Sequence, residues 1–199
     1  GSQKREGKSE TSWSAILVLL GLCLLWYSSA SAAIVTSKVT LMRTHAPFSL
    51  CVTQFLCATI CGATYHLLFD EDGLKGLAIA PAKRFSILKV AASFVMGFLF
   101  TNMSFSYLAA PTVETIKTSQ TVTSVLLSIV FASMTPDPSP TVSEIVCMIP
   151  IVVGVFLATY ADFDLVPMGV VCVIAANISF SLRGVFLKQH RFLFPTVSS

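Results

Sequence analysis

A carboxylate and an ammonium group, Glu114 and Lys117, interrupt an otherwise apolar stretch of the chain. Residues three apart share one face of a helix, so the two side chains can form an ion pair. Further hydrogen-bonding side chains follow at Thr118, Gln120, Thr121 and Ser124. A fixed cation beside hydroxyl and amide groups is suited to hold a phosphate group. The pattern therefore predicts a binding site for an anionic, phosphorylated solute.

A simpler interpretation of Glu114 and Lys117 is a structural ion pair in which each charge neutralises the other. A charge within a membrane span costs roughly 2.5–3.5 kcal/mol on insertion scales, so such charges pair or face a cavity. The two interpretations are compatible. A carboxylate can hold the ammonium group while the site is empty and release it to a phosphate when solute arrives.

The composition requires a membrane around these charges. The chain has 199 residues, of which 54% are hydrophobic and 12% charged, and its mean hydropathy is +0.79. A soluble domain carries about a quarter charged residues. The net charge of +3 is too small to indicate nucleic acid binding, and we expect none.

Apolar stretches of spanning length recur along the chain, and each needs roughly 20 residues to cross a bilayer. They lack the alternation of a membrane β-barrel strand. We therefore expect an all-α integral membrane fold. The predicted helices cover about 14–38, 46–69, 86–108, 111–133, 141–160 and 165–187. Pro150 predicts a kink in the fifth of these, because proline disrupts a helix interior.

The predicted organisation is a polar cytoplasmic tail at 1–13, one membrane domain at 14–190 and a second tail at 191–199. Lysine and arginine in short loops are concentrated on the cytoplasmic side of a membrane protein. With a cytoplasmic N-terminus that side would hold Lys4, Arg5, Lys8, Lys75, Lys83, Arg84, Lys89, Lys188 and Arg191. The other side would hold only Lys38 and Arg43.

Catalytic and metal-binding patterns are missing from the sequence. His45, His66 and His190 lie at segment ends, far from an evident nucleophile. Cys57 and Cys61 share a helical face, which we interpret as packing because free cysteine behaves as a small hydrophobe. We expect neither enzyme activity nor a cofactor or metal. Arg183, near the end of the sixth helix, is expected to extend to the interface, with a gating role as the alternative.

A series of short motifs stands in order along the chain. They are Trp26-Tyr27 followed by Lys38, then TNMSF at 101–105, ETIKTS at 114–119, IPIVVGV at 149–155 and AANISFSLR at 175–183. Together they resemble the triose-phosphate translocator family of the drug/metabolite transporter superfamily, over about residues 15–190. The resemblance implies ten helices in two inverted five-helix repeats, of which this sequence contains about the first six.

The resemblance also implies roles for particular residues. Lys117 matches the family lysine that binds substrate phosphate, and Thr101 matches a substrate-facing threonine. Thr121 would be a further hydrogen-bond partner and Glu114 the resting counter-ion. Phe98 and Glu114 stand where plastid members carry histidine, which argues against assuming triose phosphate as the solute.

The expected function is antiport of phosphorylated sugars or nucleotide sugars against phosphate or a nucleotide monophosphate, by alternating access. Expected partners are a small anionic phosphorylated solute, the lipid bilayer and a second copy of the chain as a homodimer. The expected location is the Golgi or another endomembrane, with the plastid envelope as the alternative. The competing hypothesis is a truncated, non-transporting membrane protein that acts as a structural or regulatory partner.

Overall fold

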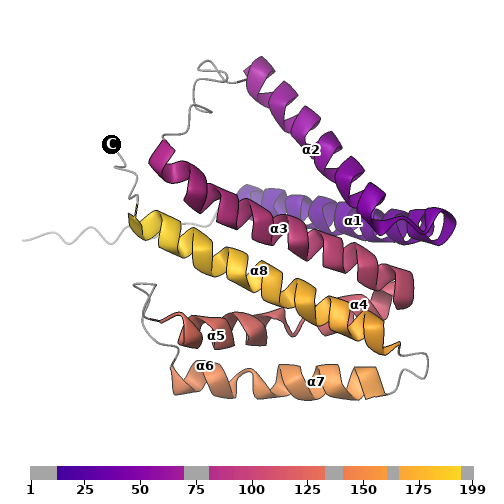
Figure 1. Cartoon of the computed structure of the whole chain (residues 1–199), viewed down its shortest axis with the longest axis vertical. Helices are drawn as coiled ribbons and strands as arrows, with labels where there is room; N and C mark the ends of the chain where they lie inside the picture. Colours follow the sequence, from indigo (N-terminus) through magenta and orange to yellow (C-terminus); the bar gives the residue numbers. More distant parts are fainter. Residues whose placement is uncertain (1–12, 70–80, 133–140, 161–165, 194–199) are drawn as a thin grey trace, which may run out of the picture. The chain divides into compact units, whose positions relative to one another are not determined.

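A computed structural model describes residues 13–69, 81–132, 141–160 and 166–193. Every regular element in these residues is an α-helix, as the composition predicts. Figure 1 labels them in chain order: α1 (Trp13–Thr44), α2 (Pro47–Phe69), α3 (Pro81–Tyr107), α4 (Ala110–Lys117), α5 (Gln120–Val130), α6 (Val142–Val146), α7 (Ile149–Tyr160) and α8 (Pro167–Leu193).

Most of these helices have the length and composition of membrane spans, which confirms the predicted class of integral membrane protein. The qualifying segments are Ala15–Thr44, Pro47–Phe69, Arg84–Tyr107, Val142–Tyr160 and Pro167–His190. The segment predicted as one helix over 111–133, which the structure divides into α4 and α5, is not among them, since its many polar residues lower its hydropathy.

The chain divides into two compact units, Gly1–Ser37 and Lys38–Ser199. The described part of the first unit is α1 from Trp13 to Ser37. Large apolar side chains of this part, such as Leu24 and Trp26, are more than two-thirds exposed. Side chains of this kind suit contact with lipid. The helix continues to Thr44, beyond its predicted end at 38, so Lys38 lies inside the helix and not at its end.

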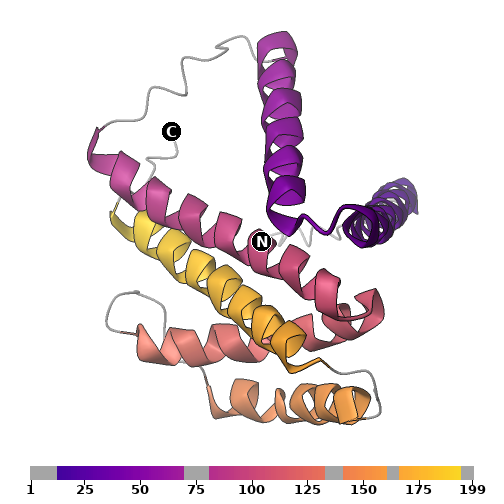
Figure 2. The same cartoon turned by 45° about the vertical axis from the view of Figure 1, so that its right-hand side comes forward.

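The second unit is organised around the pair formed by α3 and α8, which run side by side in Figures 1 and 2. Helices α4 and α5 pack against α8, and α7 packs against α4. Small polar side chains are buried together with apolar ones in this core; they are Thr101, Asn102 and Ser104 on α3, and Asn177 and Ser181 on α8. Membrane helices associate through small and polar residues because lipid gives no hydrophobic drive to helix contact.

Two glycines bring α3 and α8 close together. A Cβ atom on Gly97 would lie 2.7 Å from the ring of Phe180, and one on Gly169 would lie 2.5 Å from Leu108. Phe180 is held by edge-to-face contacts with Phe94 and Phe98, at centroid distances of 6.2 and 5.6 Å. The ring therefore has little freedom to move aside for a larger residue.

The helix predicted over 141–160 is interrupted at Cys147 and Met148, between α6 and α7. Pro150 lies at the second residue of α7, where it cannot donate a backbone hydrogen bond to Val146. At the other end, Thr141 and Glu144 form a capping box that starts α6. The helix is therefore interrupted two to three residues before the proline.

Several predicted features lie wholly or partly outside the described residues. These are the two tails, the long connection at 70–84 and the loops around Pro136–Pro140 and Asp162–Asp164. The predicted orientation depends on charges in these regions and stays a prediction. Lys89, which was counted among the loop charges, lies within the membrane span of α3.

The close approach of α3 and α8 predicts that Gly97→Ala destabilises the protein. The added methyl group meets a ring that its neighbours hold in place, and overpacking of this kind costs about 1–3 kcal/mol. Gly184→Ala on α8 is the matched control, since a Cβ there meets nothing within 4 Å. Thermal unfolding in detergent should show a lower midpoint for Gly97→Ala alone; equal midpoints would contradict the packing.

Candidate functional site

The predicted site lies where the fourth membrane segment changes helical geometry. Helix α4 ends at Lys117, and α5 begins at Gln120. Between them the backbone tightens: the amide of Thr118 bonds to Thr115 O at 3.2 Å, and that of Ser119 bonds to Ile116 O at 3.0 Å. The predicted continuous helix over 111–133 is therefore wrong at the residues that follow Lys117.

Neither proline nor glycine occurs between 112 and 130, so side chains must cause the break. The hydroxyls of Thr118 and Ser119 each donate a 2.7 Å bond to a backbone carbonyl of the preceding turn, Thr115 O and Ile116 O. Back-bonding of this kind bends helices. Asn177 of α8 donates to the same carbonyl of Ile116 at 3.2 Å. The sequence pattern alone did not reveal this contribution from another helix.

The expected ion pair is present, with Lys117 Nζ 3.2 Å from Glu114 Oε1. The two side chains are 24% and 37% exposed, respectively, so the pair lies at the edge of the described structure instead of in its core. An exposed pair of this geometry contributes only a few tenths of a kcal/mol. The carboxylate therefore holds the ammonium group in place without binding it tightly.

The polar side chains after Lys117 divide between two sides of the helix. Thr115, Thr118 and Thr121 line a cavity of about 520 Å³ next to Pro150 and Gly154 of α7. Thr121, a predicted partner of the phosphate, thus faces the neighbouring segment α7.

Residues on the other side of α5 face α8. Ser124 Oγ lies 2.8 Å from Ser181 Oγ, and Ser181 also approaches the carbonyl of Gln120 at 3.5 Å. The single polar strip expected from helical spacing therefore meets two neighbours: its threonines line the cavity beside α7, and Ser124 meets α8.

Thr101, the other predicted partner, is buried in α3 with 7% of its surface exposed. Its hydroxyl donates to Gly97 O of its own helix at 2.9 Å. Within the described ranges, no hydrogen bond joins Thr101 to Glu114, Lys117 or Thr121. The structure thus brings together Glu114 and Lys117, while Thr101 and Thr121 lie in separate environments.

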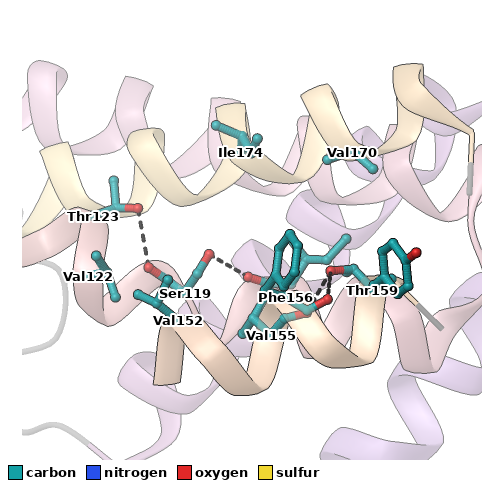
Figure 3. Close-up of a pocket in the computed structure, with 11 residues that line it drawn as sticks. Ser119, Val122, Thr123, Val152, Val155, Phe156, Thr159, Val170 and Ile174 are labelled. Carbon is teal, nitrogen blue, oxygen red and sulfur yellow. Dashed lines mark hydrogen bonds between the residues drawn. The ribbon is translucent and has the colours of Figure 1, made fainter. Parts of the chain in front are cut away.

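A larger cavity, of about 580 Å³, lies between α5, α7 and α8 and is drawn in Figure 3. Its hydroxyl groups bond to backbone carbonyls: Thr123 to Ser119 O at 3.3 Å, and Thr159 to Val155 O at 2.6 Å. The remaining lining is mainly aliphatic and aromatic, and Lys117 is not part of it. This cavity suits an apolar group better than an anion.

The donors available to a phosphate near Lys117 are few. Each hydroxyl has one proton, and Thr115 and Thr118 both spend theirs on carbonyls, at 2.9 and 2.7 Å. The ammonium group has three protons and makes one described hydrogen bond, to Glu114. Lys117 is therefore the group that can meet an anion first, and the hydroxyls of Thr115 and Thr118 can join only by rotating away from the backbone.

Lys38 is a polar anchor that was predicted to lie at the end of the first helix. Its ammonium group donates to Leu108 O at 2.7 Å and also to Phe105 O, where α3 ends. A cation at a helix C-terminus is favourable because the last carbonyls carry partial negative charge. The lysine fixes the corner from which α4 begins. The available sequence signal was that apolar residues continue after Lys38 as far as Met42, so that this charge lies inside an apolar stretch.

Arg183 faces α3. Its guanidinium carbon lies 4.8 Å from the ring centre of Phe94, at cation–π distance. Arg183 thus has an aromatic partner in the pair formed by α3 and α8. The prediction that its side chain extends to the membrane interface did not include this contact.

Comparison with known proteins assigns the chain to a protein family. The family model described as the triose-phosphate transporter family matches residues 17–192. A triose phosphate/phosphate translocator of Brassica oleracea, described as of the non-green plastid and chloroplastic, is 28% identical over 92% of this chain. Chloroplastic phosphoenolpyruvate/phosphate translocators 1 of Arabidopsis thaliana and of rice are 29% and 30% identical, over 92% and 95% of the chain.

The aligned region covers 44%, 43% and 43% of these three relatives, so the chain spans less than half of their length. No solved structure matches the chain.

The anchor at the end of α3 predicts that Lys38→Met destabilises the second unit. The substitution keeps the side-chain length but leaves two carbonyls without their donor, and a lost bond of this kind costs about 1–3 kcal/mol. Arg43→Met, on an exposed position of the same helix, is the control. Thermal unfolding in detergent should separate the two variants. Indistinguishable midpoints would mean that Lys38 does not hold this corner.

Proposed function

Because the chain belongs to the triose-phosphate transporter family, we propose that the protein exchanges a phosphorylated solute for phosphate across a membrane, with Lys117 as the phosphate-binding residue. The observation that supports this assignment is the state of the Lys117 ammonium group. It lies at the end of α4, partly exposed, and is held 3.2 Å from a single carboxylate. A cation held in this way can be transferred to an incoming phosphate at little cost.

The exchange proceeds by alternating access, in which the site opens to one side of the membrane at a time. Glu114 neutralises Lys117 while the site is empty, which lowers the cost of an unpaired cation in the membrane. Phosphate then replaces the carboxylate. The hydroxyls of Thr101 and Thr121 become hydrogen-bond partners when the surrounding helices rearrange around the bound solute.

The proposed solutes are small phosphorylated metabolites of the kind that name the curated relatives, triose phosphate and phosphoenolpyruvate. The same names favour a plastid membrane over the Golgi or another endomembrane. Nucleotide sugars exchanged for a nucleotide monophosphate are the alternative. Phe98 and Glu114, which stand where plastid members of the family carry histidine, motivate that alternative.

The test is counter-exchange by the natural full-length protein in liposomes loaded with phosphate. External triose phosphate, phosphoenolpyruvate and a nucleotide sugar are offered in turn, and release of labelled phosphate is measured. Exchange with either small metabolite supports the proposal. Exchange with the nucleotide sugar alone, against nucleotide monophosphate, supports the alternative. No exchange with any solute contradicts transport of phosphorylated solutes.

Neutralising the proposed phosphate-binding group should stop exchange. Lys117→Gln keeps a polar side chain of similar reach but removes the charge that meets phosphate. We expect the exchange rate to fall by at least about a hundredfold, the loss of roughly 2.7 kcal/mol of transition-state stabilisation, without a change in thermal unfolding. The control is Arg43→Gln, which removes an exposed cation. Retained exchange in Lys117→Gln would exclude this lysine.

Removing the resting counter-ion, Glu114, should increase the affinity of the site for phosphate. Glu114→Gln frees Lys117 from a pair worth about 0.5 kcal/mol, so the half-saturation concentration for phosphate should fall roughly twofold at low salt. The difference should shrink as salt screens the pair. A higher half-saturation concentration in Glu114→Gln would instead indicate that the carboxylate itself helps to bind solute.

A further inference from the structure

Asn177 of α8 forms hydrogen bonds on both sides of Lys117. Its side chain is 1% exposed, and Nδ2 donates to Ile116 O at 3.2 Å and to Ser119 Oγ at 3.1 Å. Ile116 precedes Lys117 directly and Ser119 follows two residues later. One amide group thus connects α8 to both flanks of the proposed phosphate-binding residue.

These bonds act on the break between α4 and α5. In a continuous helix, Ile116 O would accept one backbone bond, from Gln120, four residues on. Here it accepts the amide and the hydroxyl of Ser119 as well as Asn177. Three donors to this one carbonyl favour the tight turn over the regular helix. The turn also sets the direction in which α5 leaves Lys117, and with it the approach of Thr121 to α7 and of Ser124 to α8.

The carbonyl oxygen of the Asn177 side chain shows which part of the amide stabilises the break. Asn177 Oδ1 is buried and accepts no hydrogen bond from the residues that the structure describes. A buried acceptor without a partner costs about as much as a lost hydrogen bond, whereas an apolar side chain of the same size would fill the space without that cost. The neighbouring Val173 and Ala176 are equally buried and apolar. The contribution of Asn177 is therefore its Nδ2 bonds to the break.

We infer that Asn177 is a positioning residue for Lys117: through Ile116 O and Ser119 Oγ, it holds the break that sets where the ammonium group meets phosphate. The inference rests on the proposed function of Lys117. It adds that α8 controls the affinity of the site without touching the solute.

Ser181 provides a matched control on the same face of the same helix. It is 3% exposed and bonds across to Ser124 at 2.8 Å, so its removal also breaks a buried bond between α8 and α5. Neither of its partners, Ser124 Oγ and Gln120 O, adjoins Lys117. A purely structural role for Asn177 would make its variants behave like Ser181→Ala.

The experiment compares Asn177→Asp, Asn177→Leu and Ser181→Ala in the full-length protein. Asp keeps the shape of Asn and Leu its approximate size, and both lack the Nδ2 donor. Two quantities are measured: the half-saturation concentration and maximal rate of phosphate exchange, and the rate at which a neutral acylating reagent modifies Lys117, followed by mass spectrometry.

We expect both Asn177 variants to raise the half-saturation concentration about tenfold, equivalent to roughly 1.4 kcal/mol, with little change in maximal rate. The acylation rate of Lys117 should change by about threefold or more, as expected for the loss of one hydrogen bond. Ser181→Ala should change neither quantity. If the folded Asn177 variants match Ser181→Ala in both measurements, the inference is wrong. If they fail to fold while Ser181→Ala folds, the role is structural and the inference is also wrong.

The acylation measurement separates this inference from the proposed function. If the wild-type protein exchanges no phosphate, the proposed function fails. A changed modification rate at Lys117 in the Asn177 variants would still support the positioning role, and an unchanged rate would overturn it independently.

Discussion

Inside a membrane the backbone polar groups of a helix must find their partners within the protein, because lipid offers none. The break after Lys117 exists under this constraint. Its carbonyls are satisfied by the hydroxyls of Thr118 and Ser119, and by the amide of Asn177 from a helix that comes some 60 residues later in the chain. Packing of α3 against α8, which Gly97 permits, places Asn177 where it can reach. The geometry around Lys117 therefore depends on satisfying a few carbonyl groups.

The same constraint explains how three of the cations within the helices are accommodated. Lys38 meets the carbonyls at the end of α3, Lys117 meets a carboxylate and Arg183 meets an aromatic ring. These partners differ in how readily they release the cation. Lys38 donates to two carbonyls of a fixed corner, whereas Lys117 has one partly exposed partner. The contrast fits an anchoring role for Lys38 and a solute-binding role for Lys117.

The sequence predicted the helical membrane class, the positions of most helices and the Glu114–Lys117 pair, because these follow from apolar length and local spacing. It did not predict the break after Lys117, whose cause includes a hydrogen bond from α8 that no local pattern encodes. Helical spacing placed Thr121 and Ser124 on one strip, but it could not show that α7 packs beside the first and α8 beside the second. Lys38 was predicted at a helix end because the helix was ended there, whereas α1 continues to Thr44.

The central claim is that Lys117 contacts the phosphate of the solute. The most direct measurement is the acylation rate of Lys117 in the folded wild-type protein at increasing phosphate concentration. Chloride at equal ionic strength is the control, and the acylation rate of Lys38 is the internal reference. The account predicts that phosphate slows modification of Lys117 in a saturable way and leaves Lys38 unchanged. Equal modification rates of Lys117 in phosphate and in chloride would contradict it.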